Sequence, residues 1–405
     1  MIAGMSRHFA RAFVWACVLL AGCKHFGNLP WAPLLTRAEP GNTSASISFA
    51  APVYTGRSAI STYVVNCTAA GESWSARGSA SPLTVWGLSN GVEYTCDVRA
   101  SNAGGTSPTS SAVRVTPQPD PANSLASGYR LAAWAAGMSV TFPTQCTMTI
   151  WPSGRPSHAV EGYYLTPAPA GTELGAQGTS RFTRVSAMPL KVTPLEGPSA
   201  QLPMQFNICP TPSPAPTAVN AGAIGVMISG SVLFGAAEIA GHRATTLKDN
   251  ASFSFKDRQG AFITAHFIDH CNGHPTPADA GNNYHYHGLS ECVTSMVDRK
   301  TGPSHLIGVA LDGFPIYGDR DMNGQTVAPH LLDACNGITS PTPEFPQGVY
   351  HYVLPSRVKE HNASMRCYGG AISRRELAIA DSKGFCYAPQ VSGQTNMAKL
   401  NHPSP

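Results

Sequence analysis

Two segments in the second half of the sequence repeat each other in the same order, and this repeat limits the folds that the chain can adopt. The matching pairs share turn glycines, a cysteine or an aromatic run: 224–230 with 307–313, 233–235 with 316–318, 269–273 with 333–337, and 284–286 with 350–352. Such internal similarity indicates two copies of one supersecondary unit. Each copy has the pattern of a strand, a glycine turn, a second strand, a Cys-bearing segment and an aromatic strand. We therefore expect two related β units packed face to face.

The composition favours a mainly β chain with frequent turns. Of the 405 residues, 39 are Gly and 34 are Pro, which interrupts long helices. The hydrophobic content of 42% is enough for the cores of two domains. Charged residues make up 12% of the chain, and no run of Lys or Arg is longer than Arg374-Arg375. Nucleic acid is therefore not expected as a partner.

The N-terminus has the pattern of a signal peptide for export. Arg7 and Arg11 flank the start of an apolar stretch, 12–22, which is too short to span a bilayer. The stretch ends in the sequence LAGC, whose cysteine is Cys23, and it resembles the lipobox of bacterial lipoproteins. The resemblance implies a signal peptide over 1–22, a lipidated Cys23 and a tether over 23–32. It also implies attachment to a bacterial membrane, at the outer membrane or the cell surface, with the periplasmic side as the alternative.

Short alternating runs between 33 and 117 predict a β-sandwich. Three predicted strands each have one apolar face: Ala45, Ile47 and Phe49; Tyr63, Val65 and Cys67; Tyr94, Cys96, Val98 and Ala100. The stretch from Leu88 to Tyr94, with the segments after it, resembles the fibronectin type III family, and Tyr94 matches its tyrosine-corner position. The resemblance implies a role in spacing or adhesion. It also places Cys67 and Cys96 on neighbouring strands, so we expect a disulfide between them.

A linker over 118–124 leads to a larger domain over 125–390, which a polar tail over 391–405 follows. The repeats lie in this domain at about 222–290 and 305–355. Its segments DHCNGH, YHYHG, HLIGVALDGFPIYG, LLDACNG and VYHYV resemble the YHYH domain family, which is named after that tetrapeptide. The resemblance implies no activity, so whether the domain is an enzyme is left open.

The remaining cysteines are expected to form disulfides, because export leads to an oxidising compartment. Cys17 would leave with the signal peptide and Cys23 would carry lipid, so nine cysteines remain, which is an odd number. Spacing that is parallel between the copies pairs Cys271 with Cys292 and Cys335 with Cys367. The next expected pair is Cys146 with Cys209. Cys386 is left over, and the sequence leaves other pairings open.

The histidines of the YHYH tetrapeptide are candidate metal ligands. His285 and His287 are two residues apart, so on a strand their side chains share a face, and His274 precedes them by a short loop. Imidazole suits zinc or copper. Three alternatives stay open: buried structural histidines, general acid–base catalysis in a hydrolase or another enzyme, and a non-catalytic adhesion or scaffold protein that binds a protein or glycan ligand.

Differences between the two copies extend the candidate metal site. The second copy has Ile338 and Val353 where the first has His274 and His287, and it has Asp312 where the first has Ser229. If the copies pack about a pseudo-twofold axis, Asp312 could complete a set with the three histidines. Asp312 is therefore the fourth predicted ligand for the transition metal.

A second cation site is predicted after the second copy's glycine turn. Oxygen-bearing side chains at alternate positions, with a glycine at the sixth, are typical of a calcium loop: Asp319, Asp321, Asn323 and Gln325, with Asp333 as a further carboxylate. The twelfth position is His330 rather than Glu, so the loop is not a complete EF-hand. A solvated turn is the alternative.

Overall fold

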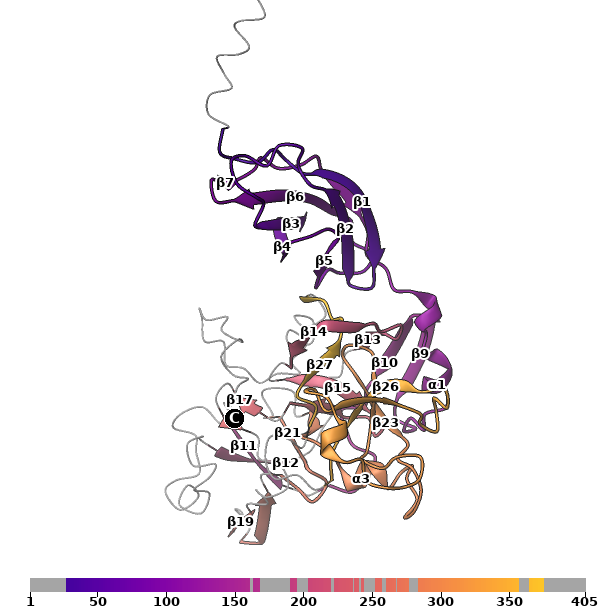
Figure 1. Cartoon of the computed structure of the whole chain (residues 1–405). Coiled ribbons are helices and arrows are strands. Elements are labelled where there is room, and N and C mark those ends of the chain that lie inside the picture. The colour runs from indigo at the N-terminus through magenta and orange to yellow at the C-terminus, as the bar shows by residue number, and fades with distance from the viewer. Residues whose placement is uncertain are drawn as a thin grey trace, which may run out of the picture. The chain divides into compact units, whose positions relative to one another are not determined.

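Alternating apolar and polar residues build the first of the chain's two units, Met1–Gln118 (Figure 1). Its strands are β1 (Leu34–Gly41), β2 (Ser44–Ala50), β3 (Thr62–Ala69), β4 (Glu72–Gly78), β5 (Leu83–Trp86), β6 (Tyr94–Asn102), β7 (Gly105–Thr106) and β8 (Val113–Val115). One sheet has the order β1-β2-β5, and the other has the order β4-β3-β6-β7, with β8 paired to β6. These two antiparallel sheets enclose one core, as the sequence predicts.

The apolar faces predicted for β2, β3 and β6 form this core. On β6, Tyr94, Cys96, Val98 and Ala100 are buried, while Thr95 and Arg99 between them are exposed. The Tyr94 hydroxyl accepts a hydrogen bond from the backbone N–H of Ser89, 2.9 Å away. This contact ties the loop before β6 to the sheet in the way a tyrosine corner does.

The structure, a computed structural model, describes residues 27–160, 163–167, 190–194, 203–219, 222–235, 237–239, 242–243, 252–256, 260–266, 268–276, 283–356 and 364–374. The predicted signal peptide, the lipidation residue Cys23, the leftover Cys386 and the polar tail lie outside these residues. In the described part of the chain, no helix has the length and apolar character needed to cross a membrane.

In the second unit, Pro119–Pro405, the described regular structure is also mainly strand. Its short helices are η2 (Pro121–Asn123), α1 (Ala126–Tyr129), α3 (Glu291–Thr294) and η4 (Pro329–Leu331). Its smaller sheets consist of β9 (Ser139–Thr144), β10 (Thr147–Trp151) and β13 (Met204–Asn207); β11 (Tyr163–Pro167), β12 (Leu190–Pro194), β19 (Ser252–Lys256) and β20 (Phe262–His266); β14 (Pro212–Ala218) and β27 (Cys367–Gly370); and β17 (Ala237–Ile239) and β18 (His242–Arg243). The predicted mainly β class is thus confirmed.

The two sequence copies form a single sheet of eight strands. In the first copy these strands are β15 (Ala223–Met227), β16 (Val232–Phe234), β21 (Gly273–Pro275) and β22 (Tyr284–Tyr286), and in the second they are β23 (Leu306–Ala310), β24 (Pro315–Tyr317), β25 (Gly337–Ser340) and β26 (Val349–Val353). Their order is β21-β22-β16-β15-β23-β24-β26-β25, which reads as one half followed by its mirror order. Each half has the same pairing, since β16 runs parallel to β22 as β24 does to β26.

The expectation that the copies pack face to face is wrong, because they join edge to edge. β15 and β23 pair antiparallel, with Val226 opposite Val309 at the centre of the join. Gly225 and Gly308 flank that centre, and a Cβ on either would lie 2.6–2.7 Å from a backbone oxygen of the other strand. The two strands therefore approach closely at a pseudo-twofold axis that runs through the sheet.

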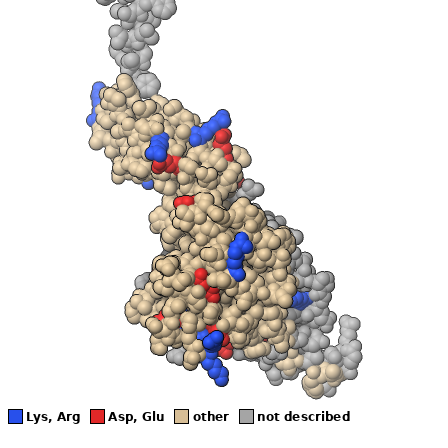
Figure 2. All heavy atoms as spheres, turned by 90° about the vertical axis from the view of Figure 1, so that its right-hand side faces the viewer, with Lys and Arg blue, Asp and Glu red and all other residues tan. Residues whose placement is uncertain are grey.

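Charged side chains are sparse on the surface. Figure 2 shows one face on which Lys and Arg are scattered among a few Asp and Glu. Among the described ion pairs, Arg37 with Glu39 and Arg114 with Glu93 are solvent-exposed, and such pairs contribute little to stability. Core packing and disulfides therefore contribute more than ion pairs to the stability of each unit.

Candidate functional site

Three histidines of the first copy lie side by side in the eight-stranded sheet. β21 pairs antiparallel with β22, and this pairing places His274 directly opposite His285. His287 follows two residues later, so its side chain is on the same face. All three are buried, at 0–2% exposure. The phenyl ring of Phe234 stacks on the ring of His285, with centroids 3.9 Å apart.

The ring nitrogens of these histidines converge. One ligand nitrogen from each ring lies within 4.8 Å of the other two. His274 Nε2 and His287 Nε2 lie 3.0 Å apart. Two nitrogens bound to one tetrahedral zinc at the usual bond length are about 3.3 Å apart, so this separation fits shared coordination. Without a metal, the same distance fits a hydrogen bond in which one ring donates.

Backbone carbonyls orient two of the three rings. The Nδ1 atom of His287 lies 2.9 Å from the Gly235 carbonyl oxygen, and Nδ1 of His285 lies 3.3 Å from that of Asn283. A ring that donates from Nδ1 keeps its lone pair on Nε2, which in His287 is the atom that lies beside His274. This is the arrangement by which proteins set the tautomer of metal-binding histidines.

The other face of β22 carries a tyrosine network. The Tyr284 hydroxyl donates to the carboxylate of Asp269 at 2.8–2.9 Å, and Tyr164 donates to the same carboxylate at 2.9 Å. Burial holds the pKa of Tyr284 well above its usual value, and the nearby Asp269 charge adds to this shift. The Tyr284 phenol therefore remains protonated and serves as a hydrogen-bond donor.

Asp269 also closes the turn that carries Cys271. Its Oδ1 accepts from the backbone N–H groups of Cys271 and Gly273, at 2.9 and 3.2 Å. Asn272 between them has a φ of 62°, in the left-handed region that Asn tolerates. The same turn recurs in the second copy, where Asp333 accepts from Cys335 and Gly337. The residues shared by the copies thus build the fold.

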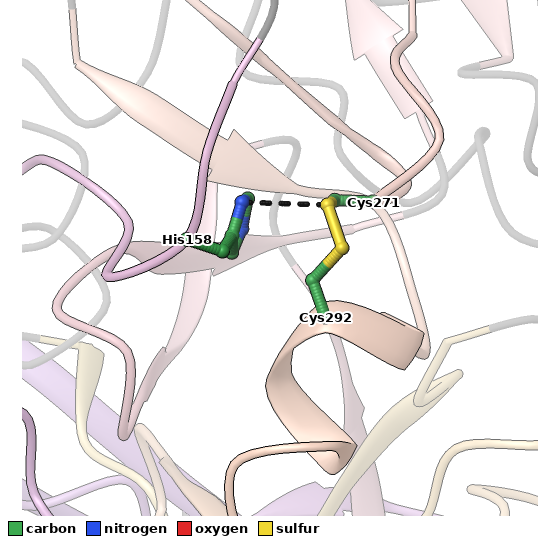
Figure 3. Close-up of side chains that lie close together, drawn as sticks. All are labelled: His158, Cys271 and Cys292. Atoms are coloured by element: carbon green, nitrogen blue, oxygen red, sulfur yellow. Dashed lines mark hydrogen bonds between the residues drawn. A yellow bond between two sulfur atoms is a disulfide. The ribbon is translucent and has the colours of Figure 1, made fainter.

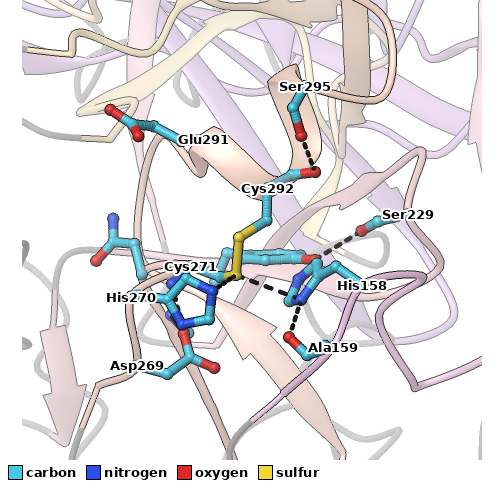
Figure 4. The surroundings of a disulfide bond; sticks show 12 residues. His158, Ala159, Ser229, Asp269, His270, Cys271, Glu291, Cys292 and Ser295 are labelled. Carbon is cyan, nitrogen blue, oxygen red and sulfur yellow. Dashed lines mark hydrogen bonds between the residues drawn. A yellow bond between two sulfur atoms is a disulfide. The ribbon is translucent and has the colours of Figure 1, made fainter.

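Cys271 of this turn forms a disulfide with Cys292, and two imidazoles flank the Cys271 sulfur. Figure 3 shows His158 Nδ1 directed at the Cys271 sulfur, at 3.3 Å. Figure 4 shows His270 on the other side of the same sulfur, with its Nε2 also at 3.3 Å. His158, Cys271 and Cys292 have the spacing of a metal-binding group. Metals bind cysteine as thiolate, however, so the closed disulfide removes both sulfur ligands.

Family comparisons agree with this architecture. Residues 204–328 match the model described as YHYH protein, and residues 32–116 match the fibronectin type III domain. The chain carries both domains. The YHYH match covers all the strands of the first copy in the eight-stranded sheet, and β23 and β24 of the second.

Comparisons with other proteins add similarities of limited extent. No curated protein matches the chain. Among solved structures, a twitchin kinase region from C. elegans is 22% identical over 22% of this chain and 17% of its own, with a TM-score of 0.21. A human fibronectin type III domain containing protein 3 domain is 28% identical over 23% of this chain and 86% of its own (TM-score 0.19), and the FN5 domain of Drosophila Lar is 23% identical over 22% and 99% (TM-score 0.19).

In the YHYH domain, Asp312 does not join the three histidines. Its carboxylate accepts hydrogen bonds from the Tyr352 hydroxyl on β26 and from the backbone N–H of Gly370 on β27. It occupies the position that Ser229 has in the first half, where the Ser229 hydroxyl bonds to Tyr286. The edge-to-edge join explains the difference, because it keeps equivalent positions of the two copies apart.

The predicted calcium loop of the YHYH domain is a hydrogen-bonded turn. Asp321 Oδ1 accepts from the backbone N–H groups of Asn323 and Gln325, at 2.9 and 2.8 Å. Asp319 instead accepts from Ser356, and Asp333 closes the turn of Cys335. Among the described residues, these carboxylates do not gather into a metal-binding group.

The four described disulfides join the cysteines that the sequence pairs: Cys67 with Cys96, Cys146 with Cys209, Cys271 with Cys292, and Cys335 with Cys367. The flanking imidazoles of His158 and His270 were not predicted. His270 could have been found, because the second copy has Ala334 at that position. His158 could not, since it lies more than 100 residues before Cys271.

Proposed function

We propose that the YHYH domain binds a transition-metal ion, zinc or copper, through His274, His285 and His287. Three converging imidazoles, buried and with two of them oriented by backbone carbonyls, are a donor set that suits either metal. A zinc bound there would act as a Lewis acid or as a stabilising cross-link. The chain's own contribution is to hold three imidazole donors together in a site from which water is largely excluded.

The duplication supplies the observation that carries this proposal. The second half of the sheet has the same strand pairing, yet it has Ile338 opposite His351 and Val353 two residues further on. The fold thus forms with a single histidine at this place. The two additional imidazoles of the first half, His274 and His287, are therefore not required by the architecture, which argues for a role in binding.

A double variant that copies the second half into the first tests the proposal. In His274→Ile/His287→Val, each histidine takes the residue that its counterpart position has. Chelator-treated wild-type protein without a His tag should gain about 5–10 °C in Tm when zinc is added to about 100 times its Kd, because binding to the folded state alone stabilises it. The double variant should fold but show no such gain.

His351→Gln is the matched control, because His351 is the single histidine at the equivalent place in the second half. Its Tm should rise with zinc as the wild-type Tm does. An equal rise in the double variant, or the lack of any rise in wild-type protein with either zinc or copper, would contradict the proposal.

We further propose that the protein is exported and anchored to a membrane through lipid on Cys23, with the fibronectin type III domain as a spacer between the anchor and the YHYH domain. The LAGC sequence at the end of the apolar stretch supports the anchor. Four disulfides and a fibronectin type III domain are consistent with an extracellular protein. The order of the domains along the chain supports the spacer role.

Substitution of Cys23 tests the anchor. In a bacterial host with a lipoprotein pathway, the wild-type chain should fractionate with membranes and incorporate labelled palmitate. Cys23→Ala should lose both properties, because acylation requires the thiol. Cys17→Ala, which lies inside the apolar stretch, should keep both. Palmitate label that persists in Cys23→Ala would sink the anchor proposal.

A further inference from the structure

We propose that the Cys271–Cys292 disulfide of the YHYH domain is redox-active and exchanges with thiols, with Cys292 as the attacked sulfur and Cys271 as the leaving thiolate. This site is separate from the three-histidine cluster, and the inference does not depend on metal binding. The ligand class is a thiol, either a small thiol or the cysteine of another polypeptide.

Burial decides which sulfur an incoming thiolate can reach. Cys271 is 0% exposed and lies in the core, whereas Cys292 on α3 is only half-buried. Thiol–disulfide exchange requires in-line access to the attacked sulfur, so the approach from solvent leads to Cys292. The sulfur that must leave is then Cys271, the one that both imidazoles contact.

Hydrogen bonds place donors beside the leaving sulfur. The Tyr286 hydroxyl lies 2.8 Å from His158 Nε2 and also bonds to the Ser229 hydroxyl. If the phenol donates to Nε2, His158 carries its proton on Nδ1, the atom that lies 2.9 Å from the Ala159 carbonyl and 3.3 Å from Cys271 Sγ. That proton can be shared with a sulfur on which negative charge develops. Exposed His270 offers a second N–H from the other side.

The exchange needs no reagent other than the thiol. A thiolate, formed by loss of its proton to solvent, bonds to Cys292 Sγ while the Cys271–Cys292 bond breaks and its electron pair stays on Cys271 Sγ. Attack by a second thiolate on the incoming sulfur then releases Cys292 as thiolate and forms the external disulfide. Two electrons pass from the two thiols to the protein. Imidazoles that stabilise the Cys271 thiolate make it a better leaving group.

The Cys335–Cys367 disulfide is the counterpart in the second copy, and among the described residues no imidazole is hydrogen-bonded to its sulfur atoms. Cys335 is buried and Cys367 half-buried, as in the first pair. The surrounding turn is the same, since Asn336 donates to the Ser364 carbonyl as Asn272 does to the Leu289 carbonyl. Ala334 replaces His270 next to the buried cysteine. Among the described contacts, the imidazole neighbours of the buried cysteine therefore distinguish the two disulfides.

The proposal can be tested in the folded protein. The protein is exposed briefly to reduced glutathione in the presence of a chelator, and its free thiols are then alkylated and identified by peptide mass spectrometry. The Cys271–Cys292 pair should open at least about tenfold faster than the Cys335–Cys367 pair. Glutathione should be found on Cys292 and not on Cys271. The chelator ensures that metal at the histidine cluster does not influence the result.

Reciprocal substitutions at the flanking position sharpen the test. His270→Ala, which installs the residue of the second half, should slow the opening of the Cys271–Cys292 pair, and His158→Ala should slow it further. Ala334→His should speed the opening of the Cys335–Cys367 pair. Both changed positions 270 and 334 are exposed, so the variants should fold. Equal opening rates of the two disulfides in wild-type protein, unchanged rates in His270→Ala, or glutathione on Cys271 would overturn the proposal.

Discussion

At the scale of single residues, Asp312 shows how one position diverged between the two halves of the sheet. It is fully buried and accepts from Tyr352, Phe314 and Gly370, whereas its counterpart Ser229 bonds to one tyrosine. Burial raises the pKa of Asp312 to about 6, although its hydrogen bonds oppose this shift. A carboxyl with such a pKa makes the free energy of unfolding of the domain depend on pH in the mildly acidic range.

Asp312→Asn should reveal this link. The pKa of an unfolded aspartate is about 3.9, so between about pH 4 and 6 the folded wild-type domain holds a proton that the unfolded chain has released. Its free energy of unfolding therefore falls as pH rises through this window, by up to about 3 kcal/mol, and Asn, which does not titrate, removes this fall.

Urea unfolding of both proteins from pH 4 to 7 measures the effect. The stability of Asp312→Asn relative to wild type should improve steadily as pH rises, because all other titrations cancel in the difference. A difference that stays constant over this range would show that Asp312 does not titrate there.

Residue patterns predicted the histidine cluster better than its surroundings. Strand alternation and the short loop before the tetrapeptide are local properties, so the proximity of His274, His285 and His287 follows from them. Two of the three partners of Asp312, Tyr352 and Gly370, come from β26 and β27, more than 35 residues further along the chain. Local pattern carries no information on such contacts.

At the scale of elements, the two copies share one structural motif, the turn of sequence D-x-C-N-G. Its aspartate accepts from two backbone N–H groups and from a tyrosine of the aromatic strand, Tyr284 or Tyr350. Its glycine lies so close to that tyrosine that a Cβ would collide with the phenol. The turn thus joins the Cys-bearing segment, the aspartate and the aromatic strand into one unit.

Gly337→Ala should destabilise the YHYH domain by about 1–3 kcal/mol, because the added methyl must displace the Tyr350 ring from its contact with Asp333. Gly137→Ala is the control, since a Cβ there meets its nearest neighbour at 3.6 Å, an ordinary contact. It should change the stability by less than about 1 kcal/mol. Chemical denaturation monitors both, and equal effects of the two substitutions would refute this account of the turn.

The arrangement of the two copies was not predictable from their strands. β15 and β23 are buried along their whole length, so neither shows the alternation that would mark an exposed face. A uniformly apolar strand fits the centre of a wide sheet as well as the interface of two sheets. Edge-to-edge joining follows from the close approach at Gly225 and Gly308, which only the three-dimensional register reveals.

At the scale of the whole molecule, the chain combines a fibronectin type III domain with one duplicated sheet whose halves carry different side chains at equivalent places. The first half contains three buried imidazoles, and a fourth, His270, lies beside its disulfide. The second half keeps the same turns and pairing with Ile338, Val353 and Ala334 in place of His274, His287 and His270. The second half thus serves as an internal reference for what the fold alone requires.

The binding of a transition metal by His274, His285 and His287 is the central claim, and X-ray absorption at the zinc edge tests it most directly. Zinc-loaded wild-type protein should show nitrogen neighbours at about 2.0–2.1 Å and no sulfur at about 2.3 Å, and the His274→Ile/His287→Val variant should retain no zinc after dialysis. A sulfur shell in the wild-type spectrum, or the same zinc content and spectrum in the variant, would contradict the claim.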